Sequence, residues 1–294
     1  MSMAARRIRV APVWRPLEFA SLFVSLFLAS CSLTVDADRV QCQTKADCAA
    51  RGGAFADAIC VDSVCTSNPA WSCLSAEAPP PASTQDPPYK LTLMLRDLVD
   101  QTPYKGSAQV KLCRKLDVDC AAPIATATSG DGGTVMFPVD MKGFAGYVDV
   151  KADGIVPTLF FINPPMDRDM TIPISLATPL ANQGLLFTLG RQASPGHGNI
   201  VISSLDCTGM PAAGVSYSTP NADSVTSTFY TLSDLPSGAA TATDPGGFGG
   251  LVNVPVGTAT VIANLSSPKV ELARISLLVQ DGAISYSTVV PLAN

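Results

Sequence analysis

Histidine is nearly absent from this chain of 294 residues, since His197 is the only one. A Ser-His-Asp triad or a Cys-His pair would have to use it, and one chain cannot form a metal site with two histidines. His197 lies in Ser-Pro-Gly-His-Gly-Asn, with no acidic residue close in sequence, which is typical of a loop. We expect no enzyme activity, no cofactor and no metal, because residues suited to general acid–base catalysis are not clustered.

Charged residues are also few, at 15% against about 25% in an average soluble domain. Glutamate is the scarcest of them: only Glu18, Glu77 and Glu271 are Glu, while 21 of the 24 acidic residues are Asp. Asp favours turns, whereas Glu and Lys favour helix interiors. Together with 22 Gly and 24 Pro, this composition predicts short strands joined by turns.

Long apolar runs are missing too, because no stretch of 18 apolar residues occurs, and we expect no transmembrane helix in the mature protein. Residues 19–29 form a shorter apolar run after four arginines, a pattern typical of a secretory signal. The run ends in Leu28-Ala29-Ser30-Cys31, which resembles the bacterial lipobox, whose cysteine is diacylated and becomes the first mature residue. The alternative is an ordinary signal peptide whose Cys31 joins a disulfide.

Lipidation of Cys31 implies a protein held on a bilayer by its acyl chains, after removal of residues 1–30, with residues 31–41 as a tether. Ser32 follows the cysteine, and this favours the outer membrane. Four Arg and one Glu lie in residues 1–30, so the mature chain keeps 15 basic and 23 acidic residues, a net charge of −8. That charge disfavours nucleic acid and anionic surfaces as partners.

Cysteine is abundant by contrast. Residues 42–74 predict a small module held by disulfides, because such a density outside the cytosol is typical of disulfide scaffolds. Zinc is the weaker alternative, since the spacing lacks a C-x2-C pair and no histidine is near. The disulfide candidates are Cys42, Cys48, Cys60, Cys65, Cys73, Cys113, Cys120 and Cys207.

Parity limits how these eight cysteines can pair. Cys113 and Cys120 bracket a charged six-residue turn, and a hairpin there would bring them within bonding distance. Five cysteines would then remain upstream, so full oxidation would require one of them, best Cys73, to reach Cys207. The alternative is a free, buried Cys207 and one free cysteine upstream, because connectivity cannot be read from a sequence.

A repeat follows the Pro-rich linker of residues 75–88. Ala-Thr-Ala-Thr-Ser-Gly-Asp-Gly-Gly at 125–133 matches Ala-Thr-Ala-Thr-Asp-Pro-Gly-Gly at 240–247, at an offset of 115 residues. This period has the size of a domain and predicts two copies, at 89–178 and 193–294. Residues 179–192 connect them, and Pro179 and Gly190 are typical of the two ends of a short helix.

Each copy reads as strands of alternating apolar and polar residues, a pattern that predicts one buried and one wet face. About seven short strands per copy favour an all-β fold: two tandem antiparallel β-sandwiches of the Ig or transthyretin-like type after the small disulfide-rich module. The predicted strands are 91–95, 108–112, 147–151, 157–162, 171–176, 200–205, 214–218, 229–232, 251–254, 258–264, 273–280 and 284–290.

Thr241-Ala242-Thr243-Asp244-Pro245-Gly246-Gly247, with Gly214-Val215 upstream and a hydrophobic strand downstream, resembles the carboxypeptidase regulatory-like domain. The first copy keeps Gly146-Tyr147 and Val150, but Ser129-Gly130 stand before Asp131, so its turn is expected to be one residue longer. The resemblance covers about 200 mature residues. It implies a transthyretin-like sandwich of the carbohydrate-binding-like kind, and the whole layout resembles a Gram-negative surface lipoprotein.

Three further motifs have a chemical and a structural interpretation. Asp131 and Asp167-Arg168-Asp169 could ligate calcium, but the EF-hand spacing is absent and turns fit better. The glycines of 246–250 lack the lysine of a phosphate loop. Phe160-Phe161 and Phe144 with Tyr147 could form an aromatic platform for a sugar, but aromatic residues in strands are more often core.

These observations favour a non-catalytic, lipid-anchored, monomeric envelope protein that binds a glycan or another envelope protein through sandwich loops. The alternative is a structural spacer or assembly subunit without a ligand of its own. An apolar or aromatic patch on the surface would favour binding over spacing.

Overall fold

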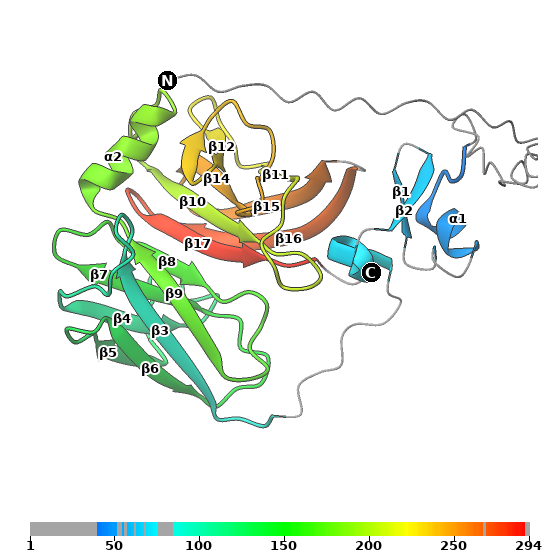
Figure 1. Cartoon of the computed structure of the whole chain (residues 1–294). Coiled ribbons are helices and arrows are strands. Elements are labelled where there is room, and N and C mark those ends of the chain that lie inside the picture. Colours follow the sequence, from blue (N-terminus) through cyan, green and yellow to red (C-terminus); the bar gives the residue numbers. More distant parts are fainter. Residues whose placement is uncertain are drawn as a thin grey trace, which may run out of the picture. The chain divides into compact units, whose positions relative to one another are not determined.

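The computed structural model describes residues 40–51, 55, 58–61, 63–67, 69–75, 85–266 and 269–291 (Figure 1). The first part contains helix α1, a two-stranded hairpin and the 3-10 helix η2: α1 Lys45–Ala49, β1 Ala58–Val61, β2 Val64–Ser67 and η2 Pro69–Ser75. The rest consists of strands and one helix: β3 Tyr89–Asp97, β4 Ala108–Cys113, β5 Ala125–Thr128, β6 Thr134–Val139, β7 Tyr147–Ala152, β8 Thr158–Phe161, β9 Met170–Leu176, α2 Pro179–Thr188, β10 His197–Ser204, β11 Val215–Ser218, β12 Ser227–Leu232, β13 Leu235–Ser237, β14 Phe248–Pro255, β15 Gly257–Ser266, β16 Lys269–Val279 and β17 Ile284–Val289.

The fold is all-β, and two sandwiches follow the disulfide-rich segment. In the first, the sheet β6-β3-β9 faces β5-β4-β7-β8; in the second, β14-β10-β17 faces β11-β15-β16. Both place the first strand between a middle strand and the last one, which runs parallel to it. The sandwiches are therefore copies of one topology, antiparallel except where their first and last strands pair.

The copies differ in their third strand. In the first sandwich β5 pairs with β4, whereas the second places β12 and β13 beside β14 in the opposite sheet. The sequence repeat at 240–243 consequently lies outside any strand, although its counterpart at 125–128 is β5.

A buried hydroxyl marks the same point in both copies. The backbone N–H of Ala108 donates to Ser129 Oγ, and that of Val215 donates to Thr243 Oγ1, each at 3.0 Å. Gly133 and Gly247 follow four residues later, both at positive φ. The two turns are therefore equally long, and the expectation of a longer turn in the first copy was wrong because Ser129 corresponds to Thr243.

One sheet runs through both sandwiches. Strand β17 pairs in parallel with β8, in register from Ile284 opposite Thr158 to Ser287 opposite Phe161. This pairing joins the β5-β4-β7-β8 sheet of the first copy to the sheet of the second copy that contains β14, β10 and β17. The resulting sheet has nine strands, in the order β13-β12-β14-β10-β17-β8-β7-β4-β5. The ranges 89–178 and 193–294 contain the strands assigned to them, but the two copies are not separate in the structure.

Because β17 pairs with β8, side chains of the first sandwich form part of the hydrophobic core of the second. Tyr147, Leu159 and Phe161 pack with the second sandwich, while Val148 and Val150 pack in the first. The rings of Tyr147 and Phe161 stack with centroids 5.2 Å apart. The prediction of one wet face for 147–151 was therefore wrong, since side chains of both faces are buried through Val150.

Helix η2 also belongs to the second core. Trp71 and Leu74 are buried there, and the backbone N–H of Cys207 donates to the carbonyl of Ala70. The predicted module of residues 42–74 therefore divides, because its last segment packs on the second sandwich.

Candidate binding surface on helix α2

The cysteines after Cys31 form four disulfides. Their pairs are Cys42–Cys60, Cys48–Cys65, Cys73–Cys207 and Cys113–Cys120. The structure thus contains the pairing expected for full oxidation, with Cys207 bonded to Cys73. Cys31 and the lipobox lie outside the described residues.

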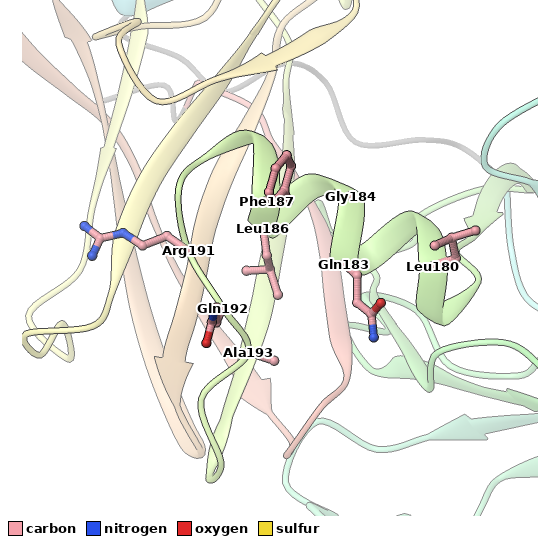
Figure 2. Close-up of a pocket in the computed structure, with 8 residues that line it drawn as sticks. All are labelled: Leu180, Gln183, Gly184, Leu186, Phe187, Arg191, Gln192 and Ala193. Carbon is pink, nitrogen blue, oxygen red and sulfur yellow. The ribbon is translucent and has the colours of Figure 1, made fainter.

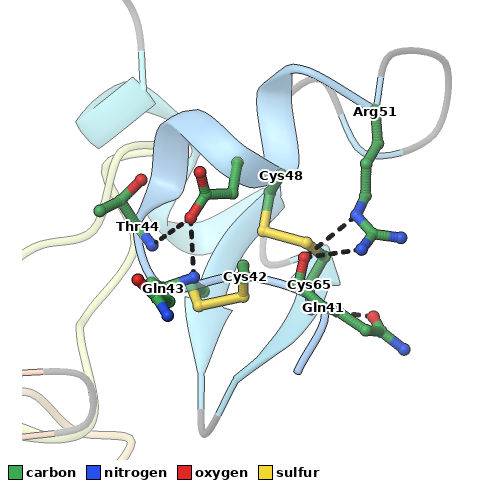
Figure 3. The surroundings of a disulfide bond; sticks show 9 residues. Gln41, Cys42, Gln43, Thr44, Cys48, Arg51 and Cys65 are labelled. Atoms are coloured by element: carbon green, nitrogen blue, oxygen red, sulfur yellow. Dashed lines mark hydrogen bonds between the residues drawn. A yellow bond between two sulfur atoms is a disulfide. The ribbon is translucent and has the colours of Figure 1, made fainter. Parts of the chain in front are cut away.

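The first two disulfides hold the segment around α1 (Figure 3). The Asp47 carboxylate accepts from the backbone N–H of Gln43 and of Thr44, each at 2.7 Å, and Arg51 donates to the carbonyl of Gln41. The sulfur atoms of Cys42, Cys48 and Cys65 lie within 4.8 Å of one another. Each is already bonded to another sulfur, so these atoms are not thiolates free to bind zinc.

The predicted aromatic platforms are part of the core. Phe144, Tyr147 and Phe161 are buried, and Phe160 packs against the first core. They present no ring to a sugar, because the side chains on the two faces of β7 and β8 pack into the two hydrophobic cores. Burial raises the pKa of Tyr147 to about 12, and its hydroxyl donates to the carbonyl of Asp117.

The predicted calcium and phosphate motifs serve turns and strands. Asp169 accepts from the backbone N–H of Lys90, and Arg168 pairs with Asp167 at 2.8 Å. Gly249 and Gly250 lie inside β14, where an added Cβ would meet backbone oxygens within 3 Å. These glycines allow close packing between strands and form no loop.

His197 faces two acceptors. Its Nε2 lies 2.9 Å from Asp223 Oδ2, and its Nδ1 lies 2.8 Å from the carbonyl of Pro195. A carboxylate and a carbonyl only accept, so satisfying both requires an imidazolium. The hydrogen bond to Asp223 and then that to Pro195 raise the pKa of His197, and the His197 contact lowers that of Asp223 to about 2. The pair fastens a loop to the start of β10.

Helix α2 joins the two sandwiches. The Thr178 hydroxyl accepts from the backbone N–H of Ala181, and Pro179 occupies the first helical turn, where its missing N–H costs nothing. Gly190, at positive φ, ends the segment. The sequence between these signals carries no charge, and its only polar side chains are Asn182, Gln183 and Thr188.

One side of α2 packs on the second sandwich. Leu186 is buried with Phe229 and Val252, and Leu185 and Leu189 pack against them. These contacts fix the orientation of the helix, because the side chains sit on the outer face of the nine-stranded sheet.

The other side of α2 exposes large apolar side chains. Leu180 is 78% exposed and Phe187 is 85% exposed, seven residues apart and therefore on one helix face. Gly184 lies between them, and a Cβ added there would meet nothing within 4 Å. An apolar stripe with a gap in its middle thus faces solvent.

A groove of about 500 Å³ follows this stripe, and Figure 2 shows Leu180 and Phe187 from the helix with Arg191, Gln192 and Ala193 from the segment after it. Its other lining residues are Gln183, Gly184 and Leu186. Arg191 is the only charged residue among them. Such a surface can bind an apolar side chain and hydrogen-bond a polar neighbour.

The sequence predicts this helix but not this surface. Loops were the expected binding elements, whereas the groove lies on the connecting segment. The available signal was that the leucines and Phe187 of α2 lie on more than one side of the helix, which exceeds what one buried face needs.

No helix in the described part of the chain is both long and apolar enough to cross a bilayer. The chain matches no protein-family model and no curated protein, so the resemblance to the carboxypeptidase regulatory-like domain stays a prediction.

Solved structures with some likeness include three bacterial proteins. The TIE protein of Bacillus anthracis is 11% identical with a TM-score of 0.23, over 69% of this chain and 34% of that one. The shaft pilin SpaA of Lactobacillus rhamnosus GG is 13% identical with a TM-score of 0.23, over 69% and 98%. A streptococcal ancillary pilin is 14% identical with a TM-score of 0.21, over 69% and 68%. TM-scores this low carry no argument about function.

Proposed function

We propose that this chain is a non-catalytic, lipid-anchored protein of the bacterial cell envelope that binds another envelope protein or a glycan. The observation that carries the proposal is the apolar stripe of α2, where Leu180 and Phe187 are 78% and 85% exposed. Exposing two large apolar side chains side by side is unfavourable in water, and their burial by a partner stabilises the complex. The binding element is then the connecting helix and not the sandwich loops.

The disulfides and the N-terminal sequence support a location in the cell envelope. Four disulfides persist in an oxidising compartment and are rare in the cytosol. Residues 19–29 and Leu28 to Cys31 provide the signal and the lipidation site in the sequence, and Ser32 favours the outer membrane. We therefore propose that the sandwiches are held on the membrane by acylated Cys31.

The chemistry of the described residues supports a non-catalytic role. His197 contacts Asp223 and the Pro195 carbonyl, and neither is a hydroxyl or thiol that the imidazole could deprotonate. The sulfur atoms from Cys42 to Cys207 are all in disulfides and are not available for attack.

Cross-linking in envelope fractions tests the binding. A photo-reactive residue at Gln183, beside the stripe, should give a discrete protein adduct, or the purified chain should bind defined sugars on a glycan array. Phe187→Ser should abolish that signal. Leu116→Ser is the matched control, because Leu116 is 92% exposed on another loop. Equal signals from both variants would contradict binding through α2.

A structural spacer is the second candidate, favoured by the sheet that runs through both sandwiches. Such a joint resists bending because Leu159 and Phe161 fill the neighbouring core. A spacer predicts that Phe187→Ser leaves envelope integrity unchanged. Loss of integrity in this folded variant supports binding through α2.

A further inference from the structure

We infer that the α2 groove recognises an acidic apolar segment of a partner protein: two apolar side chains about 10 Å apart, with a carboxylate placed to meet Arg191. This rests on the proposed function and decides between its two classes of ligand in favour of protein. The juxtaposition that supports it is Leu180, Phe187 and Arg191 along one groove (Figure 2).

The spacing comes from the helix. Leu180 and Phe187 are seven residues apart, which is about 10 Å along an α-helix. Gly184 leaves open space between them, so an apolar side chain of the partner can enter there and contact Leu180 and Phe187 on either side. Two apolar residues at i and i+7 of a partner helix have the same spacing.

The charge comes from Arg191. It follows Phe187 by four residues, makes no ion pair with any described residue, and has no acidic residue beside it in the groove. The mature chain carries a net charge of −8, so this cation stands out from its surroundings. A guanidinium binds a carboxylate through two parallel hydrogen bonds, which makes an acidic residue the complementary group.

A second copy of the chain fits less well. Helix α2 has ten residues, about 15 Å, so two such helices would bury far less than the roughly 1,200 Å² of a small specific interface. Pairing would also bring together two chains of net charge −8 and would leave both Arg191 side chains without an acidic partner. A glycan could stack on the exposed ring of Phe187. A neutral sugar, however, has no apolar group for Leu180 and no carboxylate for Arg191.

A designed peptide tests the chemistry directly. The probe is an alanine-based helix with Leu at i and i+7 and Glu one turn outside each Leu, so that either direction of binding offers a carboxylate. The control peptides replace both Glu by Lys, or both Leu by Ser. Binding to the exported, oxidised chain is measured by fluorescence anisotropy at low and at physiological salt, and the site is located from the amide shifts of Leu186 and Ala193.

We expect the Glu peptide to bind about fivefold more tightly than the Lys peptide, with the difference shrinking in salt. Arg191→Glu should reverse that preference, and Phe187→Ser should weaken both peptides about tenfold. Gly184→Glu should block the Glu peptide while preserving the helix, because the added side chain meets open space. Leu116→Ser and Arg114→Glu are controls, and both should leave binding unchanged.

Each contrary result has a distinct meaning. Equal binding of the Glu and Lys peptides, both lost in Phe187→Ser, overturns the acidic partner but leaves the α2 surface as a binding site. No peptide binding overturns the inference, and an unchanged cross-link in Phe187→Ser would then remove the proposed function as well. Glycan binding that depends on Phe187 but not on Arg191 assigns the groove to sugars, and a concentration-dependent dimer lost in Phe187→Ser assigns it to a second copy.

Discussion

Cys73 is bonded to Cys207, 134 residues later in the chain, and the bond holds η2 on the core of the second sandwich. Trp71 and Leu74 fill that core from the same short helix. A segment that begins before the Pro-rich linker is thereby part of the last domain of the chain.

Replacing Cys73 and Cys207 together by Ser should lower the free energy of unfolding by roughly 2–5 kcal/mol, because the bond closes a long loop. Denaturant unfolding followed by Trp71 fluorescence measures it, since Trp14 is the only other tryptophan and lies in the predicted signal peptide. Replacing Cys113 and Cys120, only seven residues apart, should cost less. A Cys207 thiol that alkylates without reductant in the exported protein would contradict the bond.

Phe161→Ala should destabilise both sandwiches in one transition, by roughly 3–5 kcal/mol, because its ring lies in the core of the second sandwich while its strand belongs to the first. Calorimetry and denaturant unfolding should show a single transition at lower midpoint. Phe187→Ala, at an exposed position, should change stability by less than about 0.5 kcal/mol. Two transitions, with only the first one shifted, would mean that the sandwiches unfold independently.

Gly133→Ala and Gly247→Ala should each cost more than about 1 kcal/mol, since both positions have positive φ. An added Cβ would lie 2.4 Å from the Leu95 carbonyl oxygen or 2.6 Å from that of Ser204. Gly132→Ala is the control and should be neutral, because nothing lies within 4 Å. Equal thermal midpoints for the Gly132 and Gly133 variants would contradict the strain expected at Gly133.

The loop that contains Asp223 should loosen above neutral pH. The raised pKa of His197 means that its contribution to stability is full below its unfolded pKa of about 6.5 and is lost as pH rises through the folded value. Asp223, with a pKa of about 2, contributes above about pH 4 and loses this as pH falls toward 2. Amide exchange of Val225 and Thr226 against pH, compared with His197→Gln, measures the effect. A pH dependence that persists in that variant would rule out His197 as its source.

Cys31→Ser should leave the precursor uncleaved and unlabelled by a palmitate analogue, because lipidation needs the cysteine sulfur. Ser32→Ala is the matched control and should be processed and labelled normally. Processing and labelling of the Cys31 variant would show that the signal is of the ordinary kind.

Local patterns in the sequence determined the strands, the connecting helix and the repeat. Alternating residues such as those of β3 and β4 bury one side chain in two, and Thr178, Pro179 and Gly190 bound α2 through contacts within a few residues. Parity of the cysteines made Cys73–Cys207 one of two options. The exposed stripe of α2 could not be predicted, because an apolar helix looks the same in sequence whichever side is covered.

Tertiary structure alone decided which surfaces meet. Strand β8 has the same local sequence character whether its edge is open or paired with β17, so nothing in residues 158–161 announces the nine-stranded sheet. Tyr147 and Val148 are neighbours in one strand, yet they pack in different hydrophobic cores. Successive side chains of a strand point to opposite faces of the sheet, and a different set of residues packs on each face. Periodicity specifies that a face is apolar, and only the long-range pairing of strands specifies what covers it.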